Sequence, residues 1–474
     1  MSQAVPEGHF SAPSAIEADL ARAPESIQAL VHALTEKVLS QGLEIARLRE
    51  GQGINSSNSS KPPSSDGPEV PKPTRPPSDR KQGGQPGHPK NEHPLVEHPD
   101  KVVDLHPEKC ECGATLCGED SGLELHQVHG TGTVVVTVEY RRHSRVCPKC
   151  GKTTKAPLPE GVPSGNYDLS VIATNAQKAG EFQMSRRDVV EEMGQNGLAI
   201  SGATVCKHNE ITAAALEKPY NELAENVFSV PVLHADETSW REKWRRGWMW
   251  LTATGDFSLY LIADSRSSSV ARKLLEGFTG ILCTDRYSGY AWVDAAHRQL
   301  CWAHILRNTK RLLGWGEESA RIGEALLRQI GRLFRWDRWV REGLRDHAWL
   351  HKNIHAIKRA VRRILEDGMR CPHAKTARFC ETLLKSFPSL WIFADDSRVD
   401  PTNNLAERQL RRGVMLRKTS LGTQSDEGSR FTERILTVVE TLKQQGRNVH
   451  EFIVACLRAY FYGEPYPSLL PVAA

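Results

Sequence analysis

The sequence predicts a multidomain α/β protein, and three observations lead to that prediction. The chain has 474 residues, which exceeds what one hydrophobic core organises, so we expect about three domains. Hydrophobic residues make up 39% and charged residues 25% of the chain, the ordinary balance of a folded globular protein. Apolar runs of strand length, at 230–235 and 279–284, are separated by further strand-like runs and a helix.

The cysteine count and the lack of long apolar segments predict a cytoplasmic protein. Eleven cysteines form an odd set, and several lie singly within apolar runs. That pattern suits reduced thiols and a metal site better than a disulfide framework. No apolar run reaches about 18 residues, so we expect no membrane span. The N-terminus lacks a basic stretch followed by an apolar one, so secretion is not expected.

The first recognisable element is a helix over residues 25–50. Its a and d heptad positions are Ile27, Val31, Leu34, Val38, Gln41, Ile45 and Leu48. This spacing predicts a short coiled coil, in which pairing with a second copy is favoured over folding back on the body. Gly42 weakens the helix by about 1 kcal/mol.

Residues 51–100 are rich in Ser, Asn, Pro and Gly and almost free of aromatic side chains. Such a stretch cannot bury enough apolar area to fold alone. We therefore predict a flexible linker here.

Residues 101–160 contain a candidate zinc-binding module. Cys147 and Cys150 are separated by two residues, and a glycine follows, which is the spacing of a zinc knuckle. The partner pair is Cys110 and Cys112, although Cys117 or a nearby His could substitute for one of them. One structural Zn²⁺ would replace a core that so short a segment can hardly supply. The alternative is four unligated thiols.

Residues 167–225 are expected to be entirely helical. The stretch from Ser185 to His208 has helix-turn-helix spacing, with the second helix beginning at Ser201. In a DNA-binding region of this kind Ser201, Thr204, Lys207 and His208 could face a groove. Any two packed helices joined by a short turn would give the same pattern.

A catalytic core is predicted over residues 228–430. Its strand candidates are 230–235, 247–253, 257–263 and 279–284, with a helix near 267–277. This order fits a ribonuclease-H-like α/β sheet. Basic, Trp-rich helical sequence at about 305–390 predicts a helical insertion, and 431–474 forms a C-terminal helical segment.

Three acids lie where a metal-dependent nucleic-acid enzyme would need them. Asp236 and Asp285 each end an apolar run, and Glu407 lies on a helix that starts at Thr402. Carboxylates that meet at a sheet edge repel one another unless divalent cations neutralise them. Two Mg²⁺ ions, for which Mn²⁺ could substitute, would activate water or a 3′-hydroxyl and stabilise the leaving oxygen of a phosphodiester. Taken alone, each acid is more often an ordinary strand-end or helix-surface carboxylate.

Positive charge is concentrated in one part of the chain. Between Cys301 and Ser420 there are 25 Lys and Arg against 13 Asp and Glu, whereas the whole chain has a net charge of only +5. A phosphate backbone would demand such an excess, and solvated basic helices are the alternative. The candidate DNA-binding side chains of the insertion are Arg332, Arg335 and Arg338.

Side chains around Glu407 are candidates for supporting roles. Asn403 and Arg411 lie four residues either side of Glu407 and so share its helix face. Arg411 could reach a phosphate, and Asn403 could orient Glu407. Arg408 and Arg412 lie one step round the helix, where a phosphate contact and a salt bridge are both open.

Short motifs along almost the whole chain resemble those of the insertion sequence 66 family of bacterial transposases. They include Asn55-Ser-Ser-Asn-Ser-Ser-Lys-Pro-Pro-Ser-Ser-Asp, Gly83-Gly-Gln-Pro-Gly-His, Cys147-Pro-Lys-Cys-Gly, Ala235-Asp-Glu-Thr, Thr284-Asp-Arg-Tyr-Ser-Gly-Tyr, Cys301-Trp-Ala-His, Thr402-Asn-Asn-Leu-Ala-Glu-Arg and Arg417-Lys-Thr-Ser-Leu-Gly-Thr-Gln-Ser. The resemblance implies a ribonuclease-H-like core whose Asp-Asp-Glu triad is Asp236, Asp285 and Glu407. It also implies a short N-terminal zipper and a supporting role for Cys301 and His304. The family spaces its first cysteine pair with two residues, whereas Cys110 and Cys112 have one between them.

The resemblance implies a DNA transposase that cuts the ends of its element and joins them to target DNA. Its partner would be double-stranded DNA, on which we expect a homo-oligomer, and accessory proteins of the same element could take part. We expect it in the bacterial cytoplasm, at the nucleoid when bound to DNA. A structure-specific nuclease on the same core, or a domesticated DNA-binding regulator, would be the alternatives.

Overall fold

The computed structural model describes residues 165–471 without a break, two short strands before them, and separate positions elsewhere. The described residues fall into two compact units. One, here called the sheet unit, comprises Lys218–Arg447 together with 468–471. The other, the helical unit, comprises 165–217 and Asn448–Pro467. The strands β1 (Ser144–Val146) and β2 (Thr153–Lys155) form an antiparallel pair.

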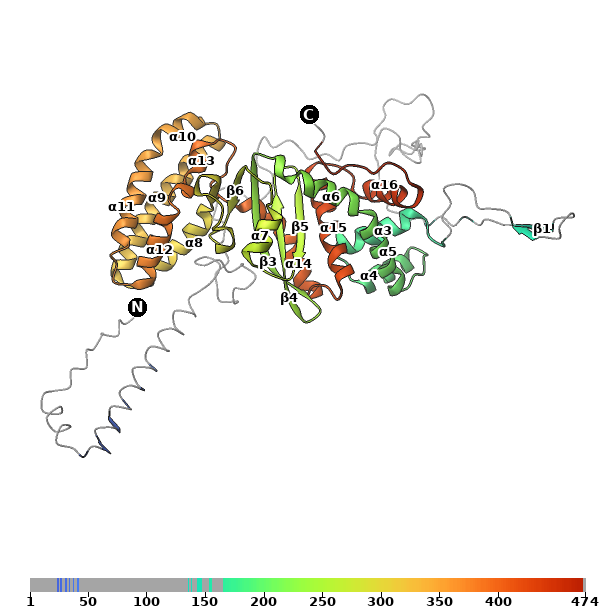
Figure 1. The fold of residues 1–474 in the computed structure, drawn as a ribbon, viewed down its shortest axis with the longest axis horizontal. Coiled ribbons are helices and arrows are strands. Elements are labelled where there is room, and N and C mark those ends of the chain that lie inside the picture. Colours follow the sequence, from blue (N-terminus) through green and yellow to red (C-terminus); the bar gives the residue numbers. More distant parts are fainter. Residues whose placement is uncertain are drawn as a thin grey trace, which may run out of the picture. The chain divides into compact units, whose positions relative to one another are not determined.

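A five-stranded mixed sheet forms the centre of the sheet unit (Figure 1). Its strands are β3 (Val232–Glu242), β4 (Arg245–Ala253), β5 (Ser258–Ala263), β6 (Ile281–Thr284) and β7 (Arg298–Leu300). The order is β5-β4-β3-β6-β7, antiparallel between β5, β4 and β3 and parallel between β3, β6 and β7. Helix α7 (Ser268–Leu274) lies in the connection from β5 to β6. The predicted mixed α/β class is confirmed.

Two helices, α14 (Asn404–Ser420) and α15 (Asp426–Gln444), pack against the sheet. The shared core contains Trp240, Met249, Leu251, Tyr260, Ala406, Leu410 and Leu436. These side chains bring α14, which carries Glu407, close to strands β3 and β4. Burial of this apolar surface therefore fixes where Glu407 lies relative to the strand that carries Asp236.

Helix α15 also satisfies the free edge of strand β5. The backbone N–H groups of Ser258, Tyr260 and Ile262 donate to Thr441 Oγ1 (3.1 Å), Thr437 Oγ1 (3.0 Å) and Glu433 Oε2 (3.0 Å). The acceptors are four residues apart on the helix, a rise of about 6 Å, and the donors are two residues apart on the strand, a rise of about 6.6 Å. The two spacings nearly match, so each acceptor lies beside a donor. The edge is thereby closed to pairing with another strand.

The segment predicted as a helical insertion is helical. Its elements are α8 (Trp302–Leu312), α9 (Glu317–Arg341), α10 (His347–Asn353), α11 (His355–Gly368), α12 (Ala374–Lys385), the 3₁₀ turn η5 (Pro388–Leu390) and α13 (Ile392–Asp395). They gather beside β6 (Figure 1), and η5 and α13 contact β7. The Trp302 indole donates to the carbonyl of Leu390 (2.7 Å), and the Phe393 N–H donates to Gln299 Oε1 (3.0 Å). These buried bonds tie the end of the insertion to the start of α8 and to β7.

The helical unit contains α3 (Leu169–Gly180), α4 (Arg186–Gln195), α5 (Gly202–Ala215) and α16 (Val449–Tyr462). Ser185 caps α4 in a capping box with Asp188, and Ser201 caps α5 by accepting from Thr204 N (3.1 Å). Helix α16 packs on α3 and α5. The segment predicted as one C-terminal piece, 431–474, is thus divided between the two units.

Short elements join the longer ones. They are α6 (Glu217–Asn226) and the 3₁₀ turns η2 (Val227–Ser229), η3 (Ser288–Tyr290) and η4 (Ala295–His297). Of the predicted coiled coil the structure describes only separate helical positions between Ser26 and Gln41. The predicted linker 51–100 lies outside the described residues. In the described part of the chain no helix is both long and apolar enough to cross a membrane.

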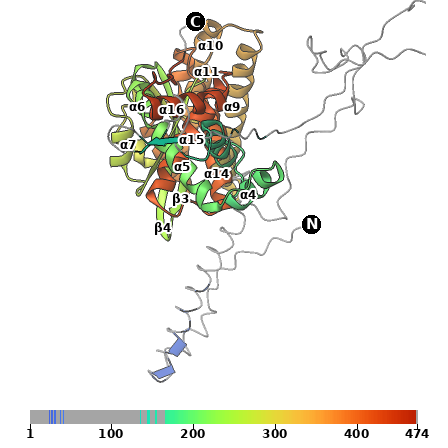
Figure 2. The same ribbon diagram turned by 90° about the vertical axis from the view of Figure 1, so that its right-hand side faces the viewer.

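The hairpin of β3 and β4 extends beyond the rest of the sheet, as both views show (Figures 1 and 2). The loop after α14 pairs with it: Thr423 N donates to Arg241 O (2.9 Å), and Lys243 N donates to Thr423 O (2.7 Å). Gly422 precedes this contact with a φ of +100°. A Cβ there would overlap the Arg241 carbonyl oxygen.

We expect Gly422→Ala to destabilise the protein, because it combines a left-handed backbone with that overlap. The cost should be about 1–3 kcal/mol or more, measured as a lower melting temperature. Gly331→Ala is the matched control, since Gly331 lies inside helix α9 with nothing near its missing Cβ. It should raise stability by up to about 1 kcal/mol. Equal melting temperatures for the two variants would contradict the packing described.

Candidate active site

Asp236 and Asp285 lie at the same edge of the parallel part of the sheet. Strand β3 pairs with β6 only as far as His234 opposite Cys283, and Asp285 directly follows the end of β6. The prediction that Asp236 ends its strand was wrong, because β3 continues to Glu242 through its hairpin with β4. Asp236 instead lies just after the point where β3 leaves β6. The result for the site is the same: both carboxylates emerge at one edge.

The carboxylates interact electrostatically. Partial burial raises the pKa of Asp236 well above its ordinary value, and the negative charges of Glu237, Asp285 and Glu407 raise it further. Asp236 Oδ1 accepts from Glu237 N (2.9 Å), and Asp285 Oδ1 accepts from Tyr287 N (2.8 Å). Within the described residues neither Asp236 nor Asp285 forms an ion pair with Lys, Arg or His. Their negative charge is thus left without a cationic side chain in contact.

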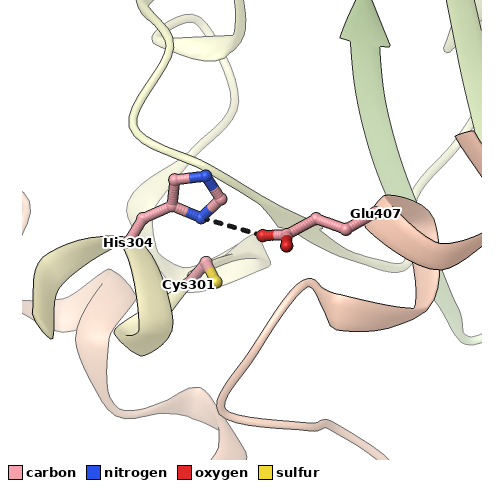
Figure 3. Close-up of side chains that lie close together, drawn as sticks. All are labelled: Cys301, His304 and Glu407. Carbon is pink, nitrogen blue, oxygen red and sulfur yellow. Dashed lines mark ion pairs between the residues drawn. The ribbon is translucent and has the colours of Figure 1, made fainter. Parts of the chain in front are cut away.

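Glu407 reaches the first turn of helix α8, where it meets Cys301 and His304 (Figure 3). Its Oε1 lies 3.3 Å from His304 Nδ1 and 3.2 Å from Arg307 Nη2. One candidate ligand atom from each of Cys301, His304 and Glu407 lies within 4.8 Å of the others, a spacing that the three predicted acids do not meet. Burial and the Arg307 charge lower the pKa of His304.

Asn403 connects the elements that carry these groups. It is fully buried at the start of α14, and its Nδ2 donates to Ala235 O (2.8 Å). Its Oδ1 lies 3.0 Å from His234 Nδ1, and its backbone N–H donates to Cys301 Sγ (3.1 Å). The side chain therefore bonds strand β3 rather than the Glu407 carboxylate. Asn403 positions α14 against β3 and the start of α8.

Sequence reasoning missed Glu237 and its partners. Glu237 is buried, Arg266 donates to its Oε1 from Nε (2.9 Å) and Nη2 (2.5 Å), and the Tyr290 hydroxyl donates to its Oε2 (2.8 Å). Burial has the largest effect on Glu237 and raises its pKa, although these donors act to lower it. One signal in the sequence could have indicated Glu237, namely a second acid directly after Asp236. Because side chains alternate along a strand, Glu237 points to the opposite face of β3 from Asp236.

Arg298 is a second residue that the sequence did not single out. It is buried on β7, and its guanidinium donates to Thr284 Oγ1 (2.9 Å) and to the carbonyl oxygen of Asp285 (2.9 Å). These bonds fix the backbone at the end of β6. Arg298 therefore holds the residue that carries the second acid without contacting its carboxylate.

The arginines proposed to contact DNA differ in their surroundings. Arg408 and Arg411 of α14 are exposed, as are three arginines spaced along α9, which are Arg332, Arg335 and Arg338. Arg412 is half-buried and donates to Glu440 Oε1 (3.0 Å), so a salt bridge forms there. Glu407 pairs with Arg307 of α8, a residue three positions after His304.

In the helical unit Lys207 is exposed, with Glu210 Oε2 3.7 Å from its amine. His208 is buried and bonded to Asn175 (2.8 Å), so it does not face a groove as predicted. The predicted zinc ligands Cys110, Cys112, Cys147 and Cys150 lie outside the described residues.

Comparison with known proteins identifies two families in this chain. Residues 183–431, just over half of the chain, match the family "Transposase IS66 family". Residues 12–94 match a family of unknown function, DUF6444.

Three curated relatives come from Sinorhizobium fredii and are named as uncharacterized proteins. The protein y4hP is 24% identical over 73% of this chain and 69% of its own length. The protein y4jD is 21% identical over 77% of both chains. The protein y4qI is 26% identical over 47% of this chain, and the matched region covers 45% of y4qI.

We expect Asp236→Asn to stabilise the protein when divalent cations are absent. A carboxyl group whose folded pKa is raised favours folding at low pH, and that contribution is lost as the pH rises through the folded pKa. At neutral pH the variant should therefore melt a few degrees above wild type. The difference should vanish near the ordinary aspartate pKa of about 3.9. Asp264→Asn, at an exposed aspartate, should change little, and a lower melting temperature for Asp236→Asn would contradict the described repulsion.

Proposed function

Because the chain belongs to the Transposase IS66 family, we propose that it cuts the ends of its mobile element and joins the liberated 3′-hydroxyls to target DNA. The observation that carries this proposal is that Asp285 at the end of β6 and Glu407 on α14 both lie near enough to Asp236 for their negative charges to raise its pKa. These three acids come from two neighbouring strands and a covering helix. Their arrangement matches the chemical need of phosphoryl transfer, which is concentrated negative charge able to hold cations.

We propose that the core is ribonuclease-H-like. Support comes from the strand order β5-β4-β3-β6-β7, in which an antiparallel meander of three strands continues into two parallel ones. The first acid then lies on the central strand β3 and the second at the end of the neighbouring parallel strand β6. The helical insertion follows β7 and returns the chain to α14, which supplies the third acid.

The residues present fit a site for divalent cations. In the part of the chain that the structure describes, no cationic side chain forms an ion pair with Asp236 or Asp285, and Mg²⁺ prefers carboxylate oxygens as ligands. We propose that Asp236, Asp285 and Glu407 hold two Mg²⁺, with Mn²⁺ as a substitute. When bound, these ions would activate the attacking hydroxyl and stabilise the leaving oxygen.

The other residues of the site would position these carboxylates. Asn403 holds α14 on β3, and Arg298 fixes the backbone at Asp285. Glu237 already forms an ion pair with Arg266 and accepts a hydrogen bond from the Tyr290 hydroxyl, so we propose that it holds the sheet edge rather than a cation. Arg307 would have to share or release Glu407 when a cation is bound, since it now lies 3.2 Å from Oε1.

Further parts of the proposal concern partners. We propose double-stranded DNA as the substrate, a homo-oligomer on that DNA, and the bacterial cytoplasm as the location. Lys207, Arg408 and Arg411 are proposed contacts in addition to the arginines of α9, and Arg412 would have to leave its salt bridge with Glu440 to join them. A structural Zn²⁺ on Cys110, Cys112, Cys147 and Cys150 remains a proposal, supported by the strands β1 and β2 that flank the second pair in sequence.

Replacing any triad acid should abolish catalysis without abolishing DNA binding. Asp236→Asn, Asp285→Asn and Glu407→Gln should each lower Mg²⁺-dependent cleavage and joining by at least about a hundredfold, because several kcal/mol of charge stabilisation is lost. The assay uses a duplex with the terminal repeat of the element, and Asp264→Asn serves as the control. Near-normal joining by Glu407→Gln would reject the triad. Cleavage without joining by wild type would indicate a nuclease.

The exposed arginines of α9 should bind the DNA backbone. Their contribution is counterion release, which is linear in the logarithm of salt concentration and indifferent to base sequence. Replacing Arg332, Arg335 and Arg338 together by Gln should weaken binding to specific and random duplexes by similar factors. The salt slope should become shallower by up to about 0.9 per lost phosphate contact.

An unchanged slope would mean that these arginines form only a solvated helical face. Loss of sequence preference at an unchanged slope would mean that they contact bases, and would contradict the proposed role as firmly.

A further inference from the structure

The group formed by Cys301, His304 and Glu407 has a chemistry unlike that of the carboxylate pair Asp236 and Asp285. It offers one sulfur, one ring nitrogen and one carboxylate oxygen (Figure 3). We propose that these three side chains bind a thiophilic divalent cation of the Zn²⁺ type. Such ligand sets favour Zn²⁺ over Mg²⁺, which takes oxygen ligands.

The spacing of the three ligand atoms is close to what a tetrahedral ion needs. Zn²⁺ bonds of about 2.0–2.3 Å at a tetrahedral angle put neighbouring ligand atoms about 3.3–3.6 Å apart. His304 Nδ1 and Glu407 Oε1 are already 3.3 Å apart. All three ligand atoms lie within 4.8 Å of one another. Small side-chain rotations would therefore close the site, and the fourth ligand would be water or a DNA oxygen.

His304 Nδ1 supplies an independent indication of a ligand. The residue is buried, with 8% of its surface exposed, and Nδ1 has no hydrogen-bond partner among the described residues. Its separation from Glu407 Oε1 is short, but the geometry is not that of a hydrogen bond. A buried polar atom without a partner costs about 1–3 kcal/mol. A cation bound at this nitrogen would remove that cost.

Burial raises the pKa of the Cys301 thiol to about 11, so a bound cation would have to displace the thiol proton. Cys301 nevertheless has two features that would stabilise the resulting thiolate. It is the N-cap of helix α8, so the positive end of the helix dipole points at its sulfur. The backbone N–H of Asn403 also donates to Sγ at 3.1 Å. Because Cys301 and His304 are three residues apart on the first turn, the fold of α8 itself sets their spacing.

Charge decides what binding would do to Glu407. A thiolate and a carboxylate together balance the charge of a dication. The positive charge of Arg307, 3.2 Å from the same Glu407 oxygen, opposes binding of that cation. Bound Zn²⁺ would hold the Glu407 carboxylate against α8. This last step rests on the proposed function: if Glu407 also serves the Mg²⁺ site, then Zn²⁺ opposes Mg²⁺-dependent catalysis.

The binding claim is tested without DNA, Mg²⁺ or any activity measurement. The full chain is titrated with Co²⁺, and the near-ultraviolet thiolate-to-cobalt band and the number of tightly bound ions are recorded. Wild type should bind one ion more than Cys301→Ser or His304→Gln, even if the predicted zinc module also takes up Co²⁺. Cys206→Ser, which removes a half-buried thiol elsewhere, should match wild type.

Two outcomes would overturn the site. One is an equal number of Co²⁺ ions and an equal band in wild type and Cys301→Ser. The other is loss of an ion in Cys301→Ser but not in His304→Gln, when circular dichroism shows that both variants are folded. If the triad variants remained active in the DNA assay, the proposed function would be contradicted but the Co²⁺ result would not change. The two claims can therefore be tested separately.

Discussion

Repulsion among half-buried carboxylates is the constraint on which the rest of this site depends. The pairing of β3 with β6 and the packing of α14 on the sheet bring Asp285 and Glu407 near Asp236, and Glu237 is its neighbour in the chain. Among the residues that the structure describes, Glu237 and Glu407 have cationic partners, in Arg266 and Arg307, whereas the two aspartates have none. The fold therefore holds an excess of negative charge that burial makes costly and that a divalent cation would neutralise.

Buried hydrogen bonds around the acids hold them in place against this electrostatic repulsion. Asn403 joins three elements through buried bonds, Arg298 fixes the end of β6, and α15 closes the edge of β5 with side chains at helical spacing. The helical insertion separates Asp285 from Glu407 by 122 residues, yet its end is bonded to β7. The third acid is therefore delivered by packing and not by proximity in sequence.

The sequence predicted the strands that carry the acids and the helix that carries Glu407, because each has a regular apolar pattern. It could not predict the extension of β3 to Glu242, which follows from hairpin pairing, or β7, which has only three residues. The pairing of Glu237 with Arg266 and of Glu407 with Arg307 joins residues far apart in the chain, so no local pattern reports it. The same holds for α16, whose partners are α3 and α5.

The most direct measurement of the central claim is the number of Mn²⁺ ions that the full chain binds on a DNA end, counted by electron paramagnetic resonance. The account predicts that wild type holds up to two ions that the double variant Asp236→Asn/Asp285→Asn does not hold. Equal numbers for the two proteins, with DNA binding intact in both, would contradict it, because the carboxylates at the sheet edge would then not be the ligands.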